Sequence, residues 1–188
     1  VVMLGVLRSF SPPSPVGADA PDVVFSAERA EGILQELLQD GVPHPTGSDA
    51  NGVVRDRIMV RFESYGYEPE IQSRFQCNPA AGSCSPVENI IAVKPGADNR
   101  YAILVTAHYD SVYAAQGAAD DGAGVAVLLE TARMMADFPP FQNDVIFLIT
   151  DSEENGLIGA RAFADHHELF DRVRVVLNLE ARGVSGPS

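Results

Sequence analysis

Asp151-Ser152-Glu153-Glu154-Asn155-Gly156-Leu157 is the stretch that decides the fold of this chain. It follows the run Asn143–Thr150, whose apolar and β-branched residues predict a buried central strand. Three acidic residues within four positions at the end of such a strand are costly unless positive charge meets them. We therefore expect a cation beyond the end of this strand.

Two further apolar runs end in side chains that can bind metal. Tyr101–Ala107 leads into His108, and Val173–Leu179 leads into Glu180. In an open α/β sheet, ligands gather beyond the carboxyl ends of the strands. The sequence therefore predicts that three strand ends deliver an imidazole and carboxylates to one edge of the sheet, which is typical of a metal site.

The order of the elements indicates an α/β fold. Helices with apolar stripes are expected over Phe25–Gln39, after an N-cap at Ser26, and from Ser48 to Gly66. Strands at Glu70–Gln76 and Asn89–Lys94 are expected to be joined through a loop that holds both cysteines. Strands then alternate with helices. This pattern predicts a mixed, mostly parallel central sheet with helices on both faces and a mixed edge near the N-terminus.

Composition limits the classes of protein to which this chain can belong. The formal net charge of −13 excludes a nucleic-acid-binding protein, because the basic footprint for phosphate is absent. Cys77 and Cys84 are close enough for a disulfide across a hairpin, which we favour over a zinc knuckle and which points to an oxidising compartment. We assign residues 1–22 to a tail and Pro/Ser-rich linker and residues 23–188 to one domain. The apolar start, Val1–Leu7, is either the end of a signal or anchor segment or a short apolar N-terminus.

The acidic residues suit a pair of zinc ions. Two neighbouring cations need an anion between them, and Asp120 or Asp121, beside glycines at the start of a helix, can provide it. Of the adjacent Glu153 and Glu154, one can bind metal while the other accepts a proton from a metal-activated water. Such a site is the minimum machinery for peptide hydrolysis.

Four motifs follow one another along the chain: His108-Tyr109-Asp110-Ser111, Gly117–Ala126, Glu153–Ala160 and Asn178-Leu179-Glu180. Together they resemble family twenty-eight of the metallopeptidases, the co-catalytic zinc aminopeptidases and their relatives. The turn Pro43–Ser48 and the helix after it also resemble the lead-in of the membrane-associated branch of this family. The resemblance implies a zinc aminopeptidase-like fold.

The resemblance also implies a role for each site residue. His108 and Glu180 bind the first zinc, with Glu180 at a position where many members carry Asp, and Asp110 orients the imidazole. Asp120 bridges the two ions, and its peptide bond to the next residue is expected to be cis. Glu154 binds the second zinc and Glu153 is the general base. The family's last ligand, a histidine, has no counterpart up to Ser188, so we expect an incomplete second site and weak activity of this chain alone.

By this resemblance the protein is a zinc-dependent exopeptidase, an aminopeptidase that hydrolyses N-terminal residues of peptides with two zinc ions per complete domain. Alternatives within the same fold are a carboxypeptidase, a glutaminyl cyclase or a non-catalytic binding ectodomain. We expect an extracytoplasmic location, with membrane anchoring through a preceding N-terminal segment.

Two histidine motifs are expected to lie outside the site. His44 lies in a turn, where a lone histidine is usually structural or solvated. The run from His166 to Asp171 begins like a zinc-binding helix, but Asp171 stands where the second histidine of that motif would be. We therefore interpret it as a solvated helix end.

Overall fold

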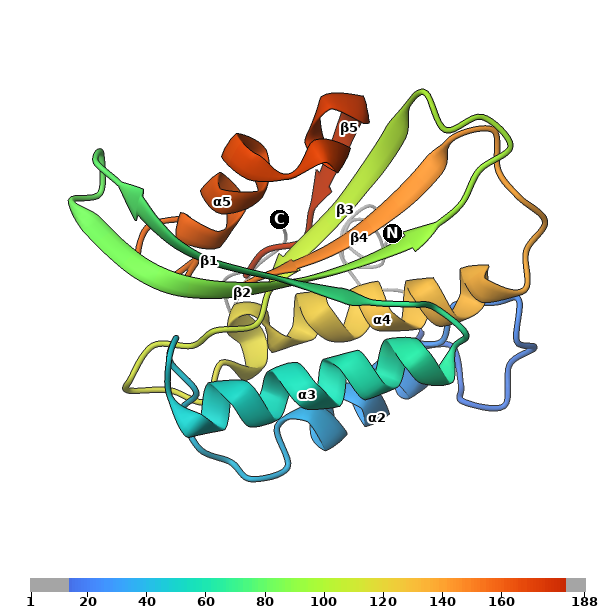
Figure 1. Ribbon diagram of the computed structural model, residues 1–188. Coiled ribbons are helices and arrows are strands. Elements are labelled where there is room, and N and C mark those ends of the chain that lie inside the picture. Colours follow the sequence, from blue (N-terminus) through green and yellow to red (C-terminus); the bar gives the residue numbers. More distant parts are fainter. Residues whose placement is uncertain (1–13, 182–188) are drawn as a thin grey trace, which may run out of the picture.

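The computed structural model describes residues 14–181, and its centre is a five-stranded sheet in the order β1-β2-β4-β3-β5 (Figure 1). β1 and β2 pair antiparallel, as do β2 and β4, whereas β3 is parallel to both β4 and β5. The predicted mixed sheet is confirmed, and its N-terminal strands β1 and β2 supply the antiparallel pairs. The strands are β1 Glu70–Asn78, β2 Ser83–Lys94, β3 Ala102–His108, β4 Asp144–Thr150 and β5 Val173–Asn178.

β4 is the buried central strand that the sequence predicts. All seven of its residues are buried, because strands flank it on both sides and helices cover both of its faces. β5 differs from this pattern. It lies at the edge of the sheet, and Val175, Val176 and Leu177 are 48%, 53% and 53% exposed.

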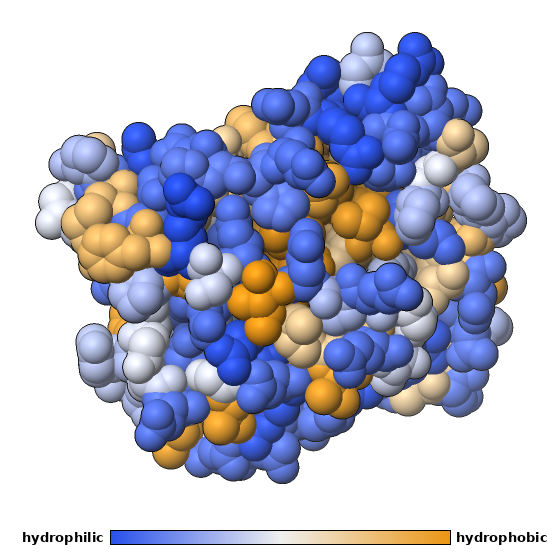
Figure 2. All heavy atoms as spheres, in the orientation of Figure 1, coloured by the Kyte–Doolittle hydropathy of each residue, from blue (hydrophilic) through white to orange (hydrophobic). Residues whose placement is uncertain are grey.

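Helices form a layer on each face of the sheet, as predicted (Figure 1). α2, α3 and α4 cover one face, and α5 covers the other. The larger apolar core lies under the first three helices, and a smaller one lies under α5, around Phe163. Figure 2 shows polar side chains over most of the same view, with hydrophobic side chains gathered toward its centre. The helices are α2 Ala27–Leu37, α3 Asp49–Ser64, α4 Ala123–Ala136 and α5 Ile158–His166, with short turns at Ala118–Gly122 and Glu168–Arg172.

The predicted helix boundaries have a local cause. The Ser26 and Ser48 hydroxyls each accept a hydrogen bond, at 3.1 Å, from the backbone amide three residues later, which satisfies a free donor at the helix start. After α3 the chain turns at Gly66 with φ +83°, a conformation that glycine adopts without steric cost. Among residues 14–181, no helix combines the length and apolar character needed to cross a bilayer.

The cysteines form the predicted disulfide, but their surroundings differ from the prediction. The strands do not stop before the cysteines. β1 and β2 continue beyond them, and Cys77 lies opposite Cys84 in the ladder, so the disulfide joins paired strands rather than closing a loop. The residues next to the cysteines are mostly polar, so the pattern of apolar residues does not predict that the strands extend this far. Backbone pairing between strands does not require apolar side chains.

The predicted tail falls in two parts. Residues 1–13, with the apolar start of the chain, lie outside the described residues. The next residues are held against α2, since the Ser26 hydroxyl donates to the carbonyls of Val16 and Gly17 at 3.1 and 2.9 Å.

Candidate metal centre

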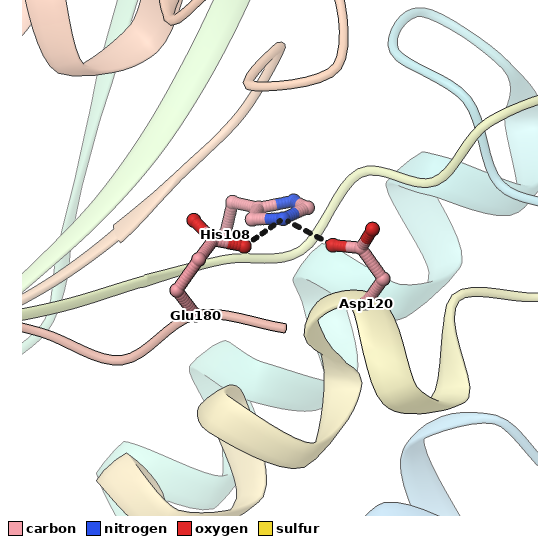
Figure 3. A group of neighbouring side chains, drawn as sticks. All are labelled: His108, Asp120 and Glu180. Carbon is pink, nitrogen blue, oxygen red and sulfur yellow. Dashed lines mark hydrogen bonds and ion pairs between the residues drawn. The ribbon is translucent and has the colours of Figure 1, made fainter. Parts of the chain in front are cut away.

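Three side chains meet at the carboxyl edge of the sheet (Figure 3). His108 is the last residue of β3, Glu180 follows the end of β5, and Asp120 lies in the turn before α4. His108 Nε2 is 3.1 Å from Asp120 Oδ1 and 3.8 Å from Glu180 Oε1, and one ligand atom from each residue lies within 4.8 Å of the others. The ends of β3 and β5 meet as predicted, but the third member of the group comes from the turn before α4 and not from the end of β4.

The donor set fits zinc. One imidazole nitrogen and two carboxylate oxygens are ligands that zinc accepts, at bond lengths of about 2.0–2.2 Å. Tetrahedral bonds of that length place neighbouring ligand atoms roughly 3.3 Å apart. The distances of 3.1 and 3.8 Å from His108 Nε2 lie close to that spacing without rearrangement of the backbone.

The other ring nitrogen of His108, Nδ1, contacts Asp110. Nδ1 lies 3.1 Å from the backbone carbonyl of Asp110 and 3.4 Å from its Oδ1. Both side chains are nearly inaccessible, at 2% and 1% exposed. With Nδ1 beside Asp110, Nε2 is the nitrogen that points at the carboxylates.

The centre favours positive charge. Burial by itself lowers the pKa of His108. The hydrogen bond and negative charge of Asp110, with the charges of Glu153 and Asp121, outweigh burial and raise this pKa to about 10. A site that holds a proton so firmly is electrostatically suited to a metal cation in its place.

The two adjacent aspartates face different ways. The Asp120–Asp121 peptide bond is cis, as expected. The Asp121 carboxylate lies beneath the centre, where it accepts hydrogen bonds from the amides of His108 and Gly124, at 3.4 and 3.1 Å. Burial raises the pKa of Asp121 to about 7, despite the opposing charge of His108. Asp120 is thus the one that reaches the imidazole, and Asp121 binds an amide in the first turn of α4.

Glu153 and Glu154 lie at the rim. Asp110 binds both of their backbone amides, at 2.9 and 3.2 Å, and so couples this loop to His108. Both glutamates lie outside the close group of three, and Glu153 Oε2 is 3.8 Å from His108 Nε2. Burial, as the largest cause, raises the pKa of both carboxyls.

The expectation that positive charge meets the whole acidic stretch is wrong for Asp151. Its carboxylate accepts hydrogen bonds from neutral donors, at 3.0 Å from Thr46 Oγ1, 3.3 Å from Asn51 Nδ2 and 3.2 Å from the Glu88 amide. Burial, aided by the charge of Asp110, raises the pKa of Asp151 to about 6. No local signal marks these partners, because Asn51 lies 100 residues away in the chain.

The other histidines lie apart from the close group, as expected. His44 is buried, and its backbone exchanges hydrogen bonds with Ser111, which anchors the turn beside the site. Burial lowers the pKa of His44. His166 is exposed and contacts a glutamine of β1. The interpretation as a solvated helix end is wrong for His167, which stacks on Phe163, lies 3.1 Å from Glu70 and has a side chain that is only 14% exposed.

Comparisons with known proteins identify related sequences and structures. Residues 89–188 match the model of Peptidase family M28. Endoplasmic reticulum metallopeptidase 1 of Rattus norvegicus is 40% identical over 179 residues, which cover 86% of this chain and 20% of the relative. The chain thus spans about a fifth of the length of the curated relatives it matches.

Solved structures share the fold. A glutaminyl cyclase from Porphyromonas gingivalis matches with a TM-score of 0.73 at 23% identity, over 86% of this chain and 60% of that one. BSAP, a zinc aminopeptidase from Bacillus subtilis, matches with a TM-score of 0.73 at 17% identity, over 86% and 70%. The family model covers more than half of the chain, including every residue of the close group, so the chain belongs to peptidase family M28.

Proposed function

We propose that the protein is a zinc-dependent exopeptidase, and specifically an aminopeptidase that removes N-terminal residues from peptides. The observation that carries this proposal is the convergence of His108, Asp120 and Glu180 at one edge of the sheet. Membership of family M28 supports a zinc-dependent peptidase. Cleavage at the N-terminus needs its own test, with peptides that differ at their ends.

We assign the zinc ligands as follows. His108, Asp120 and Glu180 hold one ion, and Asp120 and Glu154 share a second. Asp110 keeps the Nδ1 side of His108 occupied, so that Nε2 stays available as a ligand. When bound, zinc polarises the scissile carbonyl and lowers the pKa of water in its coordination sphere to about 7.

Glu153 is the proton carrier in this proposal. Its carboxylate reaches the centre but is not needed to complete the close group, which leaves Oε2 free to take a proton from the attacking water. The same atom then passes the proton to the leaving amine. A carboxyl whose pKa is raised by burial suits this task, because it accepts a proton more readily than an exposed glutamate.

Glu153→Ala separates catalysis from metal binding. We expect the variant of the full-length protein to bind zinc as the unaltered protein does and to lose peptide hydrolysis, because only the proton carrier is removed. Turnover that persists in this variant would contradict the assigned role. Zinc binding without turnover in the unaltered protein would instead indicate a binding ectodomain.

A panel of peptides decides which exopeptidase this is. Free-amine, blocked-amine and N-terminal glutamine peptides are offered to the full-length protein, and products are identified by mass. An aminopeptidase shortens only peptides with a free amine, from the N-terminus. Shortening of blocked peptides from the C-terminus would indicate a carboxypeptidase, and loss of ammonia from glutamine would indicate a cyclase.

We also propose an extracytoplasmic location for a peptidase domain spanning residues 23–188. The Cys77–Cys84 disulfide and the similarity to an endoplasmic reticulum metallopeptidase support this location. Protection from protease added to sealed vesicles, lost when detergent opens them, is the expected result. Digestion in intact vesicles would contradict it.

A further inference from the structure

The tip of the β1–β2 hairpin, Cys77–Cys84, lies against the loop that carries Glu153 and Glu154. Asn78 Nδ2 donates to the carbonyl of Gly156 at 2.8 Å, and Ser83 Oγ donates to the carbonyl of Asn155 at 2.6 Å. These two side chains come from opposite strands of the hairpin and are partners in its ladder. They bind the two residues that directly follow the glutamates.

Packing at this contact is tight. Gly156 has φ +105°, and a Cβ there would lie 2.5 Å from the Cβ of Ala81. The loop also closes on itself, since the amides of Gly156 and Leu157 donate to the carbonyl of Glu153 at 2.7 and 2.8 Å. If the hairpin tip moved, it would displace the carbonyls of Asn155 and Gly156. The backbone of Glu153 would then shift with them.

The same loop is held on its other side by Asp110, which binds the amides of Glu153 and Glu154. The backbone around the two glutamates thus has fixed partners on both sides. Asp110 connects it to the imidazole of His108, and the hairpin tip connects it to the edge of the sheet. Hydrogen bonds of this kind decide where a ligand or proton carrier points.

The disulfide holds the hairpin tip in register. Cys77 and Cys84 are partners in the ladder, directly beside the pair formed by Asn78 and Ser83. β1 is an edge strand, and the end of a two-stranded hairpin frays without further support. The covalent bond therefore lies where it best keeps both donors opposite their carbonyls.

We propose that the hairpin tip acts as a clasp: its hydrogen bonds hold in place the catalytic loop, Glu153–Leu157, which carries both glutamates. Asn78 and Ser83 are the positioning residues for Glu153 and Glu154. The inference rests on the proposed function for the roles of the glutamates. The contacts themselves exist whether or not the chain hydrolyses peptides. The disulfide thereby acquires a role in catalysis as well as in stability.

The test compares Ser83→Val with Ser83→Thr. Valine and threonine have nearly the same shape, but only threonine keeps the hydroxyl that binds Asn155. In Ser83→Val we expect amide hydrogen exchange at Gly156 and Leu157 to quicken about fivefold, since one net hydrogen bond is lost. Asn78→Ala also removes the acceptor of the Ala80 amide within the hairpin turn, so we expect it to quicken this exchange at least as much. We expect kcat to fall about tenfold or more, with KM little changed. Ser83→Thr restores both quantities.

Gln76→Ala is the matched control. Gln76 lies on β1, the strand that carries Asn78, but its side chain reaches Asp165 and His166 of α5 instead of the catalytic loop. It should leave both quantities at wild-type values. The pair Cys77→Ala/Cys84→Ala, which removes the disulfide and keeps both donors, should show the faster exchange and the lower kcat.

Unchanged loop exchange in both Ser83→Val and Asn78→Ala overturns the inference, and so does faster exchange with unchanged kcat. Failure of the proposed function has a different signature, because the unaltered protein then hydrolyses no peptide. In that case exchange and zinc affinity decide the role of the hairpin: if both are unchanged in Ser83→Val, the clasp is refuted.

Discussion

Replacing Asp110 by asparagine should weaken both zinc binding and the fold. Four groups converge on this buried carboxylate: the ring of His108, the amides of Glu153 and Glu154 and the hydroxyl of Thr46. Each amide donates to a different oxygen, Oδ1 at 2.9 Å and Oδ2 at 3.2 Å. Asparagine keeps one acceptor and turns an NH₂ group toward the remaining donors, so one backbone hydrogen bond is lost.

The size of the effect follows from that loss. A hydrogen bond to a charged group contributes about 1.5–3 kcal/mol, so the free energy of unfolding of Asp110→Asn should fall by that amount. Loss of the partner that orients a zinc-binding histidine typically lowers metal affinity about 10- to 100-fold. Asp110→Ala removes all of the contacts and should cost about twice as much stability, so asparagine is the more informative replacement.

Two measurements on the full-length protein check this prediction: urea unfolding in the presence of a chelator, and zinc affinity by competition with a chromophoric chelator. Asp137→Asn is the control, because Asp137 is exposed at the C-terminal end of α4. It should leave both results near those of the unaltered protein. Wild-type zinc affinity in Asp110→Asn would refute the reasoning that this residue orients His108.

Three further predictions follow from other buried polar groups. Burial raises the pKa of Asp151 from 3.8 to about 6, so the folded state retains a proton that the unfolded chain releases and this group destabilises the fold as pH rises. Relative to the unaltered protein, the free energy of unfolding of Asp151→Asn should therefore rise by about 2 kcal/mol between about pH 4.5 and 7.5 in urea titrations; a constant difference would contradict this. Glu130→Ala should lose about 3 kcal/mol in the same assay, because the fully buried Glu130 carboxylate pairs with arginines of α2 and α4 at 3.0 and 2.7 Å; a near-neutral effect would show that the pairs do not stabilise the fold. Gly124→Ala should lose about 1–3 kcal/mol in thermal unfolding, because a Cβ there would overlap the Asp121 carboxylate; wild-type stability would mean that the turn adapts.

The sequence carries most of the information on the sheet. Apolar runs that end in His108, Asp151 and Glu180 predict three adjacent strand ends, because helical crossovers make such strands parallel and bring their carboxyl ends to one edge. The helix caps at Ser26 and Ser48 are local signals and are equally readable. These features depend on neighbours within a few residues or on the periodicity of one segment.

The partners around the site could not be predicted in the same way. Asp151 begins the acidic stretch after β4, yet only the fold brings Thr46 and Asn51 to it. The contacts of the hairpin tip with the catalytic loop likewise join segments more than 70 residues apart. Such contacts depend on how β2 pairs with β1 on one side and with β4 on the other, and hydrophobic periodicity does not encode that arrangement.

X-ray diffraction at the zinc absorption edge, on crystals grown with zinc, tests the central claim most directly. The account predicts an anomalous peak about 2.0–2.2 Å from His108 Nε2 and from carboxylate oxygens of Asp120 and Glu180. Its peak height should fall in crystals of His108→Ala. A zinc peak elsewhere, with the His108 imidazole turned away from both carboxylates, would contradict the claim that these three strand-end and turn residues form the metal centre.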